Sequence, residues 1–138
     1  MCIRDRDSVV VLDKLTYAGN LENVAPVSHD PRLRVVEGDI LDRPTVDRLM
    51  AETDAVVHFA AESHVDRSIM GAAEFVMTNV VGTQTLLDSA VGHGIERFVH
   101  VSTDEVYGSI DEGSWDEERP LEPNSPYSAS KLPSSIEP

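Results

Sequence analysis

Basic side chains, cysteine and long apolar runs are all scarce in this sequence. Eleven Lys and Arg residues stand against 25 Asp and Glu, a formal net charge of −14, which disfavours nucleic acid and anionic membranes as partners. The single cysteine, Cys2, excludes an internal disulfide. No apolar run approaches the ~18 residues of a membrane span, and no signal-peptide pattern opens the chain. We therefore expect a cytoplasmic protein without a membrane partner.

The sequence also lacks a metal-binding pattern. Its five histidines are scattered and its one cysteine is remote from them, so no spacing is typical of metal ligands. No metal is expected. The acidic stretch 111–118 is interpreted as a solvated loop.

Apolar strand-like runs alternate with helix-like stretches along the chain, which favours an α/β fold. β-branched runs predict strands at 8–12, 33–37, 55–59 and 98–102. Helices are expected at 21–27 (ended by Pro26), 42–52 (with Asp42 as N-cap), 72–91 and 126–132. This order predicts a Rossmann-like doubly wound parallel sheet. The residues that follow its strands should meet at one edge: Asp13, Asp39, Ala60 and Ser102.

The longest predicted helix, 72–91, has an apolar side. We expect these residues to point inward: Phe75, Val76, Val80, Leu86, Leu87 and Val91. Thr78 and Asn79 interrupt that side. They are interpreted as cofactor-facing or structural polar groups.

The stretch from Phe98 to Lys131 contains the residue types that suit proton and hydride chemistry. A buried strand delivers hydroxyls and carboxylates at its carboxyl end, where ligands bind in open α/β sheets. Tyr127 and Lys131 are four residues apart, so a helix would place both on one face. A lysine ammonium beside a phenol favours the phenolate. Such a pair can take a proton from a sugar hydroxyl while a nicotinamide takes the hydride.

Three blocks of this sequence resemble motifs of one known family and follow one another in the same order as in that family. They are 13–20 (DKLTYAGN), 60–68 (AAESHVDRS) and 102–108 (STDEVYG), followed by the Tyr-x-x-x-Lys of Tyr127 and Lys131. Together they are similar to the dTDP-glucose 4,6-dehydratases, in the extended branch of the short-chain dehydrogenase/reductase superfamily. The resemblance runs from about Val9 to Lys131. It implies NAD as cofactor, a nucleotide sugar as substrate and a homodimeric parent enzyme.

The resemblance implies which residues hold NAD. Asp13, at the end of the first strand, suits the adenosine ribose hydroxyls. Asp13 could instead only cap a loop, although the following Lys14, Leu15 and Thr16 favour the ribose. The other implied cofactor residues are Asp39 and Ile40 against the adenine, then Phe59, Ala60, Ala61, Glu62, Ser63, Thr78, Tyr127 and Lys131.

The resemblance also implies a dehydratase mechanism. Tyr127, with Lys131, takes the proton of the sugar C4 hydroxyl as NAD accepts the hydride. Glu105 then removes the C5 proton, and Asp104 donates to the C6 oxygen so that water leaves. Thr103 and Ser63 bind the substrate. Adjacent carboxyl groups can divide such roles when their environments differ.

Three other interpretations stay open. The Asp104–Glu105 pair could be the start of a solvated loop. The chain could belong to a sugar-nucleotide epimerase or decarboxylase, which shares Tyr-x-x-x-Lys, although an epimerase needs no elimination. It could also be no enzyme at all, but an inert fragment or an interaction module.

The inert-fragment interpretation rests on a missing glycine-rich loop. A ribose-binding acid normally follows that loop by about 20 residues, and no glycine precedes Asp13. We therefore expect an incomplete sheet, without its first strand and a carboxyl-terminal substrate region, and an isolated chain that is inactive. The expected organisation is a disordered leader (1–7), a partial NAD-binding domain (8–132) and an irregular tail (133–138).

Overall fold

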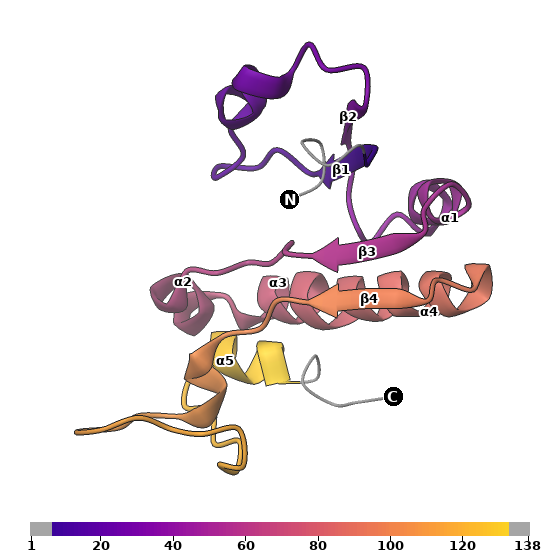
Figure 1. The fold of residues 1–138 in the computed structure, drawn as a ribbon. Helices are drawn as coiled ribbons and strands as arrows, with labels where there is room; N and C mark the ends of the chain where they lie inside the picture. The colour runs from indigo at the N-terminus through magenta and orange to yellow at the C-terminus, as the bar shows by residue number, and fades with distance from the viewer. Residues whose placement is uncertain (1–6, 133–138) are drawn as a thin grey trace.

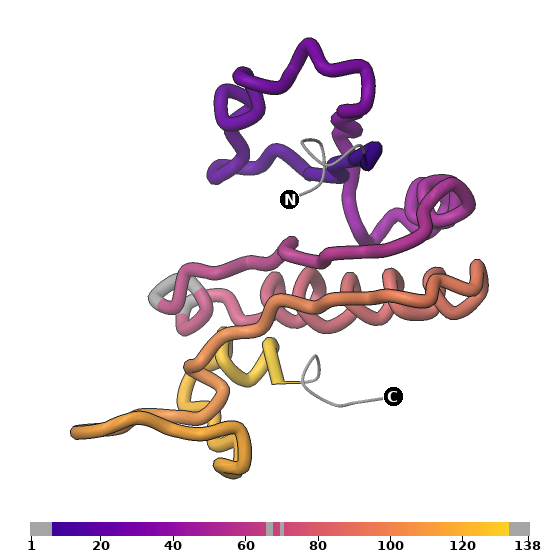
Figure 2. The backbone as a smooth tube through the Cα atoms, in the orientation of Figure 1, coloured from indigo at the N-terminus to yellow at the C-terminus, as the bar shows by residue number. Residues whose placement is uncertain are grey.

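The computed structural model describes residues 7–132, in which strands and helices alternate (Figures 1 and 2). The strands are β1 (Val9–Asp13), β2 (Leu33–Glu37), β3 (Ala55–His58) and β4 (Arg97–His100). The α-helices are α1 (Arg43–Met50), α2 (Val65–Met70), α3 (Ala72–Phe75), α4 (Thr83–His93) and α5 (Pro126–Lys131). Two 3-10 helices, η2 (Leu21–Val27) and η4 (Asp104–Tyr107), and one π-helix, η3 (Val76–Gly82), complete the set. The predicted α/β class is confirmed.

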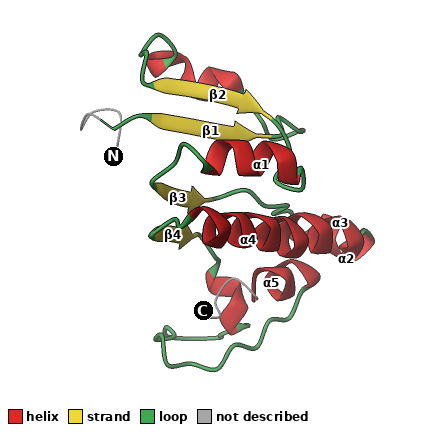
Figure 3. Ribbon diagram, turned by 90° about the vertical axis from the view of Figure 1, so that its right-hand side faces the viewer, coloured by secondary structure: helices red, strands yellow, loops and turns green. Residues whose placement is uncertain are grey.

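The four strands form two parallel pairs. β1 pairs with β2, with Val9 opposite Leu33, and β3 pairs with β4, with Ala55 opposite Arg97. Both pairs point to the same side in Figure 3. The parallel pairing is confirmed, but the single sheet of the prediction is present as two two-stranded sheets.

The break between the pairs falls between β1 and β3. If β1 to β4 are counted as the second to fifth strands of the doubly wound order, the first strand belongs between β1 and β3. No strand of residues 7–132 lies there. Direct pairing of β1 with β3 would have closed the gap. Instead, Leu12 of β1 and Val56 of β3 both pack against the same hydrophobic core cluster. The two sheets are therefore connected through this core and not by hydrogen bonds between β1 and β3.

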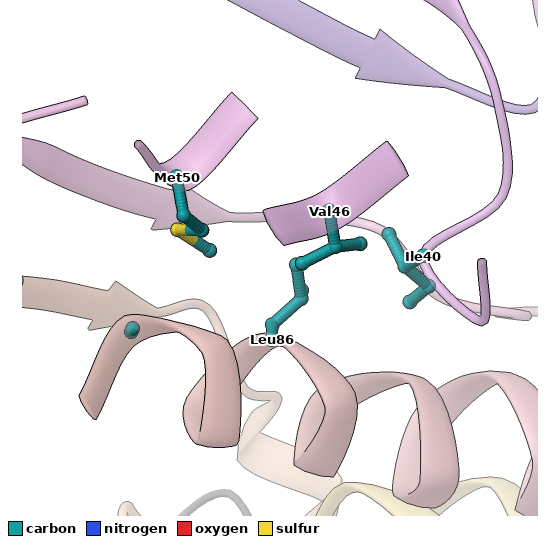
Figure 4. Packing of buried hydrophobic residues seen from close by; sticks show 5 residues of the cluster. Ile40, Val46, Met50 and Leu86 are labelled. Atoms are coloured by element: carbon teal, nitrogen blue, oxygen red, sulfur yellow. The ribbon is translucent and has the colours of Figure 1, made fainter. Parts of the chain in front are cut away.

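That core lies between α1 and α4 (Figure 4). It consists of five buried side chains: Ile40, Val46, Met50, Leu86 and Ala90. Pro44 lies in the first turn of α1 and has no N–H to satisfy there. Asp42 is the N-cap as predicted, but its side chain makes no capping hydrogen bond.

The predicted helix 72–91 is a continuous run of α3, η3 and α4 that ends at His93. Gly94 terminates it in the left-handed conformation, with φ of 68°. The prediction of its inward side is partly wrong. Phe75 and Leu86 are buried, but Val76 is exposed and Val91 is 81% exposed. The buried face instead carries polar residues, and the next section shows why they are tolerated.

Two short helices were not predicted, α2 and η4. Both follow the carboxyl end of a strand, and both are too short to show a helical period in the sequence. η2 was predicted as a short helix ended by Pro26, but Pro26 lies inside it. The expected end of α5 before Pro133 is confirmed, because its C-cap is Leu132. The predicted tail 133–138 lies outside the described residues, as does nearly all of the predicted leader 1–7.

Candidate functional site

The loops that follow β1 and β2 are joined by an ion pair. Lys14 Nζ lies 2.6 Å from Asp39 Oδ2, and Asp39 Oδ1 also accepts the Leu41 N–H over 2.9 Å. Burial raises the pKa of Asp39, but the hydrogen bonds from Lys14 and Leu41 outweigh it and leave that pKa lowered. The same bond raises the pKa of Lys14. Both side chains are therefore charged at neutral pH.

A cavity of about 350 Å³ opens beside this ion pair. Its lining brings together three predicted cofactor residues from three different loops or helices, Lys14, Glu62 and Thr78. Tyr17 adds a link between the loops after β1 and β3, because its hydroxyl donates to Glu62 Oε2 over 3.2 Å. The structure thus gathers residues that lie 64 positions apart in sequence at the carboxyl edge of the strands.

The other predicted cofactor residues differ in their burial and in their hydrogen bonds. Asp13 Oδ1 accepts the Leu15 N–H over 2.7 Å, and Leu15 has a φ of 50°. Asp13 therefore does cap its loop, and its role at a ribose stays a prediction. Ile40 is part of the hydrophobic core, whereas Phe59 is 66% exposed. Thr16 and Ser63 are exposed, and Ala60 and Ala61 are half-buried.

The predicted acid and base lie on η4, directly after β4. Thr103 caps this helix: its Oγ1 accepts the Glu105 N–H and donates to Asp104 Oδ1, each over 3.3 Å. Asp104 is exposed and Glu105 is half-buried. The two carboxyl groups are therefore adjacent in the chain but differ in environment.

Helix α5 presents Tyr127 and Lys131. Ser125 and Ser128 form a reciprocal capping box at its start, which helps so short a helix to form. Tyr127 is half-buried and lies edge-on to Phe75, with ring centroids 6.5 Å apart. α5 packs against η4, and so the Tyr-x-x-x-Lys helix lies beside the Asp104–Glu105 pair.

Lys131 is buried, with 3% of its surface exposed. Its Nζ donates to the Val101 carbonyl over 2.9 Å and lies 3.3 Å from His100 Nε2. Burial lowers the pKa of Lys131. Burial, and then the Lys131 ammonium, lower the pKa of His100 to about 4. Burial lowers the pKa of His58 to about 4 as well, with His100 and Lys131 adding to the effect.

One amide joins three parts of the site. Asn79 Oδ1 accepts the Glu62 N–H over 2.8 Å, and Asn79 Nδ2 donates to the Glu62 carbonyl over 2.9 Å and to Ser130 Oγ over 2.8 Å. Ser130 Oγ in turn donates to the Tyr127 carbonyl over 2.7 Å. Of the two interpretations of Asn79, the structural one is confirmed. Its hydrogen bonds are what makes a polar residue tolerable on the buried face of the helical run.

Sequence reasoning missed three members of the site: His58, His100 and Thr83. His58 and His100 were treated only as possible metal ligands. The predicted strands 55–59 and 98–102 each contain one of these histidines, but only the register of β3 with β4 makes the two direct partners.

No three metal-ligating side chains gather among the residues that the structure describes. Nor does that part of the chain contain a helix with the length and apolarity to cross a membrane.

Known proteins match this chain closely. The family model "GDP-mannose 4,6 dehydratase" matches residues 3–136. The dTDP-glucose 4,6-dehydratase of Streptomyces antibioticus is 65% identical over 93% of this chain and 37% of its own length. The solved structure of DesIV, a dTDP-glucose 4,6-dehydratase from Streptomyces venezuelae with NAD and TYD bound, is 67% identical with a TM-score of 0.90, over 93% of this chain and 40% of that one.

A UDP-Glc/GlcNAc 4-epimerase from Campylobacter jejuni shares the architecture at lower identity. It is 30% identical with a TM-score of 0.84, over 92% of this chain and 39% of that one. The chain thus spans about 40% of the length of the relatives that it matches. Its family follows from the model that covers nearly all of it: the chain belongs to the GDP-mannose 4,6 dehydratase family.

Proposed function

We propose that this chain is the segment of an NAD-dependent dTDP-glucose 4,6-dehydratase that carries the catalytic side chains. One observation carries the proposal: the helix with Tyr127 and Lys131 is anchored at the end of β4, where Asp104 and Glu105 follow. The anchor is the 2.9 Å hydrogen bond from Lys131 Nζ to the Val101 carbonyl. The identity of 65% to the Streptomyces antibioticus dehydratase supports this reaction over others of the superfamily.

The described residues include groups that suit the adenosine end and the nicotinamide end of NAD. At the adenosine end, Asp13 would bind the ribose hydroxyls, and the cavity beside Lys14 would take the base. At the nicotinamide end, Tyr127 and Lys131 would hold the second ribose. Residues 7–132 form no glycine-rich helix terminus of the kind that binds a pyrophosphate. NAD, when bound there, would supply the acceptor for the hydride of sugar C4 and, once reduced, the donor of the hydride that C6 receives.

Tyr127 takes the proton of the C4 hydroxyl in the oxidation step. A positioned side chain contributes to such a proton transfer only within hydrogen-bond reach, and α5 places Tyr127 beside η4. Thr103 would hold the C4 oxygen. To do so its hydroxyl must turn from Asp104, to which it donates over 3.3 Å, a long bond that is easily exchanged.

Glu105 and Asp104 carry out the elimination. The C4 ketone acidifies the C5 proton, which Glu105 removes. Asp104 gives a proton to the C6 oxygen, and the C6–O bond breaks as water leaves. The division of roles between the two carboxyl groups follows the family resemblance, and their difference in exposure is compatible with separate roles.

A chimera tests the proposal. Residues 3–136 would replace the matching segment of the Streptomyces venezuelae enzyme, and the chimera is expected to convert dTDP-glucose to its 4-keto-6-deoxy product, identified by NMR. Asp104→Asn and Glu105→Gln should each slow water loss by roughly 10²–10⁴-fold while sparing C4 oxidation in single-turnover experiments. An equal fall in both steps would show that the division of roles is wrong.

The second candidate is a nucleotide-sugar 4-epimerase, which the Campylobacter jejuni structure favours at the level of fold. The Asp104–Glu105 pair argues against it, since epimerisation requires no acid for a leaving water. A 4-epimer as the product of the chimera would establish this alternative.

The 138-residue chain alone is expected to bind NAD weakly and to be inactive. The reason is that residues 7–132 form no glycine-rich helix terminus for the pyrophosphate. Calorimetric titration with NAD measures this, and a sub-millimolar dissociation constant would contradict it. A cytoplasmic location and a homodimeric parent enzyme stay proposals that rest on the resemblance.

A further inference from the structure

Two histidines meet at the end of the second sheet because of its register. His58 closes β3 and His100 closes β4, and the two are direct partners in the parallel ladder. Their ring centroids are 4.7 Å apart at an interplanar angle of 64°. Thr83 of α4 contacts the first ring, and Lys131 of α5 contacts the second. The imidazoles therefore link two strands and two helices at the buried side of the site.

Hydrogen-bond donors fix the protonation of each ring. The Thr83 hydroxyl donates its one proton to the Asn79 carbonyl over 2.6 Å, so it can only accept from His58 Nε2, which lies 3.0 Å away. His58 therefore carries its proton on Nε2. A lysine ammonium has donors and no acceptor. His100 Nε2, 3.3 Å from Lys131 Nζ, therefore accepts, and the proton of His100 is on Nδ1.

We propose that His100 is a positioning residue for Lys131: its neutral imidazole accepts a hydrogen bond from the ammonium and, with the Val101 carbonyl, fixes that ammonium at the end of β4. This rests on the proposed function only for the role of Lys131 in catalysis. The positioning itself is a statement about geometry. His100 acts through Lys131, because the hydrogen bond joins its ring to the ammonium.

Only neutral histidine can do this. Protonated His100 would place a second cation 3.3 Å from the ammonium and leave no acceptor on Nε2. Among the residues that the structure describes, the titratable groups that face His100 are His58 from β3 and Lys131 from α5. With its pKa lowered to about 4 by burial and by Lys131, His100 is neutral over the working range of an ordinary cytoplasmic enzyme.

The other side of the ring supports a role beyond packing. His100 Nδ1 is buried without a hydrogen-bond partner, and such a group costs stability. A phenylalanine would fill the same space without that cost. A histidine at this position is therefore explained by what Nε2 does and not by the stability of the fold.

Chemical labelling of the two lysines tests the proposal on the 138-residue chain. Lys14 and Lys131 are the only lysines in the sequence, and Lys14, 59% exposed in its side chain, is an internal control. Acetic anhydride labelling, read by mass spectrometry, should modify Lys131 far more slowly than Lys14. In His100→Phe the rate at Lys131 should rise about tenfold or more, because hydrogen bonds to charged groups are the strong class.

His100→Gln is the matched rescue variant, since its side-chain oxygen reaches the position of Nε2. It should restore slow labelling at Lys131, whereas Lys14 should react equally in all three chains. An unchanged rate at Lys131 in His100→Phe would overturn the proposal, as would fast labelling in both variants.

Nitrogen NMR of the unmodified chain tests it without any variant. At pH 7 His100 should be the neutral tautomer with its proton on Nδ1, and a proton on Nε2 would overturn the proposal. The labelling and the NMR experiment both report on the hydrogen bond between His100 and Lys131, and neither requires enzymatic turnover. If the chimera described above proved to be an epimerase, or inactive, these results would stand, and failure here would leave the reaction assignment untouched.

Discussion

Replacing Asn79 should weaken the fold more than any exposed polar substitution. Its side chain is 3% exposed and makes three hydrogen bonds of 2.8–2.9 Å, two to the backbone of Glu62 and one to Ser130. Those bonds tie the loop after β3, the π-helix η3 and helix α5 to one another. Asn79→Ala removes all three at once.

The magnitude follows from the bonds. A net ~0.5–1.5 kcal/mol for each hydrogen bond, and a further penalty for the Glu62 N–H where water does not reach it, give a loss of about 2–4 kcal/mol. That is a large share of the ~5–15 kcal/mol that stabilises an ordinary domain. Ser130→Ala removes one of the three bonds, together with the bond from Ser130 Oγ to the Tyr127 carbonyl, and should cost about 1–2 kcal/mol. The double variant should cost less than the sum, because both single changes delete the same Asn79–Ser130 bond.

Urea unfolding followed by circular dichroism measures these differences. Asn124→Ala is the matched control: its amide makes one exposed hydrogen bond, to Ser109 Oγ over 2.6 Å, and its loss should stay within ~0.5 kcal/mol. If the free energy of unfolding of Asn79→Ala lay within ~0.5 kcal/mol of that of the original chain at an unchanged m-value, Asn79 would not be the residue that holds the loop after β3, η3 and α5 together.

Further predictions concern pH, backbone and surface. Stability should fall from about pH 6.5 toward pH 4, by up to ~1.4 kcal/mol per pH unit for each proton. The reason is that burial lowers the pKa of His58 to about 4, so that as the pH falls the unfolded chain binds this proton before the folded chain does. Urea midpoints at pH 7, 6 and 5 measure the loss. In His58→Gln the stability should depend less on pH. Gly92→Ala, where a Cβ meets nothing within 4 Å, should stabilise α4 by ~0.5–1 kcal/mol. Gly108→Ala should destabilise by about 1–3 kcal/mol, since Gly108 has a φ of 85° and a Cβ there would lie 2.7 Å from the Glu122 carbonyl oxygen; thermal melts of the two variants should shift in opposite directions. Val57 and Val99 are exposed register partners on the open face of the β3–β4 sheet, so Val57→Thr with Val99→Thr should lower light scattering and dye binding at high concentration; unchanged scattering would count against an apolar face that drives self-association.

Local patterns in the sequence determined a large part of this structure. The four β-branched runs are strands within one or two residues of the predicted bounds, since a buried parallel strand requires a short continuous apolar run. Helix α5 ends at Lys131, within one residue of the predicted bound, although its C-cap Leu132 keeps helical backbone angles in spite of the proline that follows it. The family was also readable, because three blocks of residues with chemical roles stand in a fixed order. Each of these properties depends on neighbours within a few positions in the chain.

Tertiary structure alone decided the contacts that complete the site. The polar buried face of the long helical run could not be read from its apolar pattern, because Asn79 is satisfied by Glu62 and Ser130, 17 and 51 positions away. The separation into two sheets depends on which strand edges meet, which no single segment specifies. The link from His100 to Lys131 spans 31 positions and exists only when the register of β3 with β4 and the packing of α5 are both in place. A hydrogen bond between distant residues takes its direction and its burial from the whole fold, so the sequence names the groups and the packing decides which of them meet.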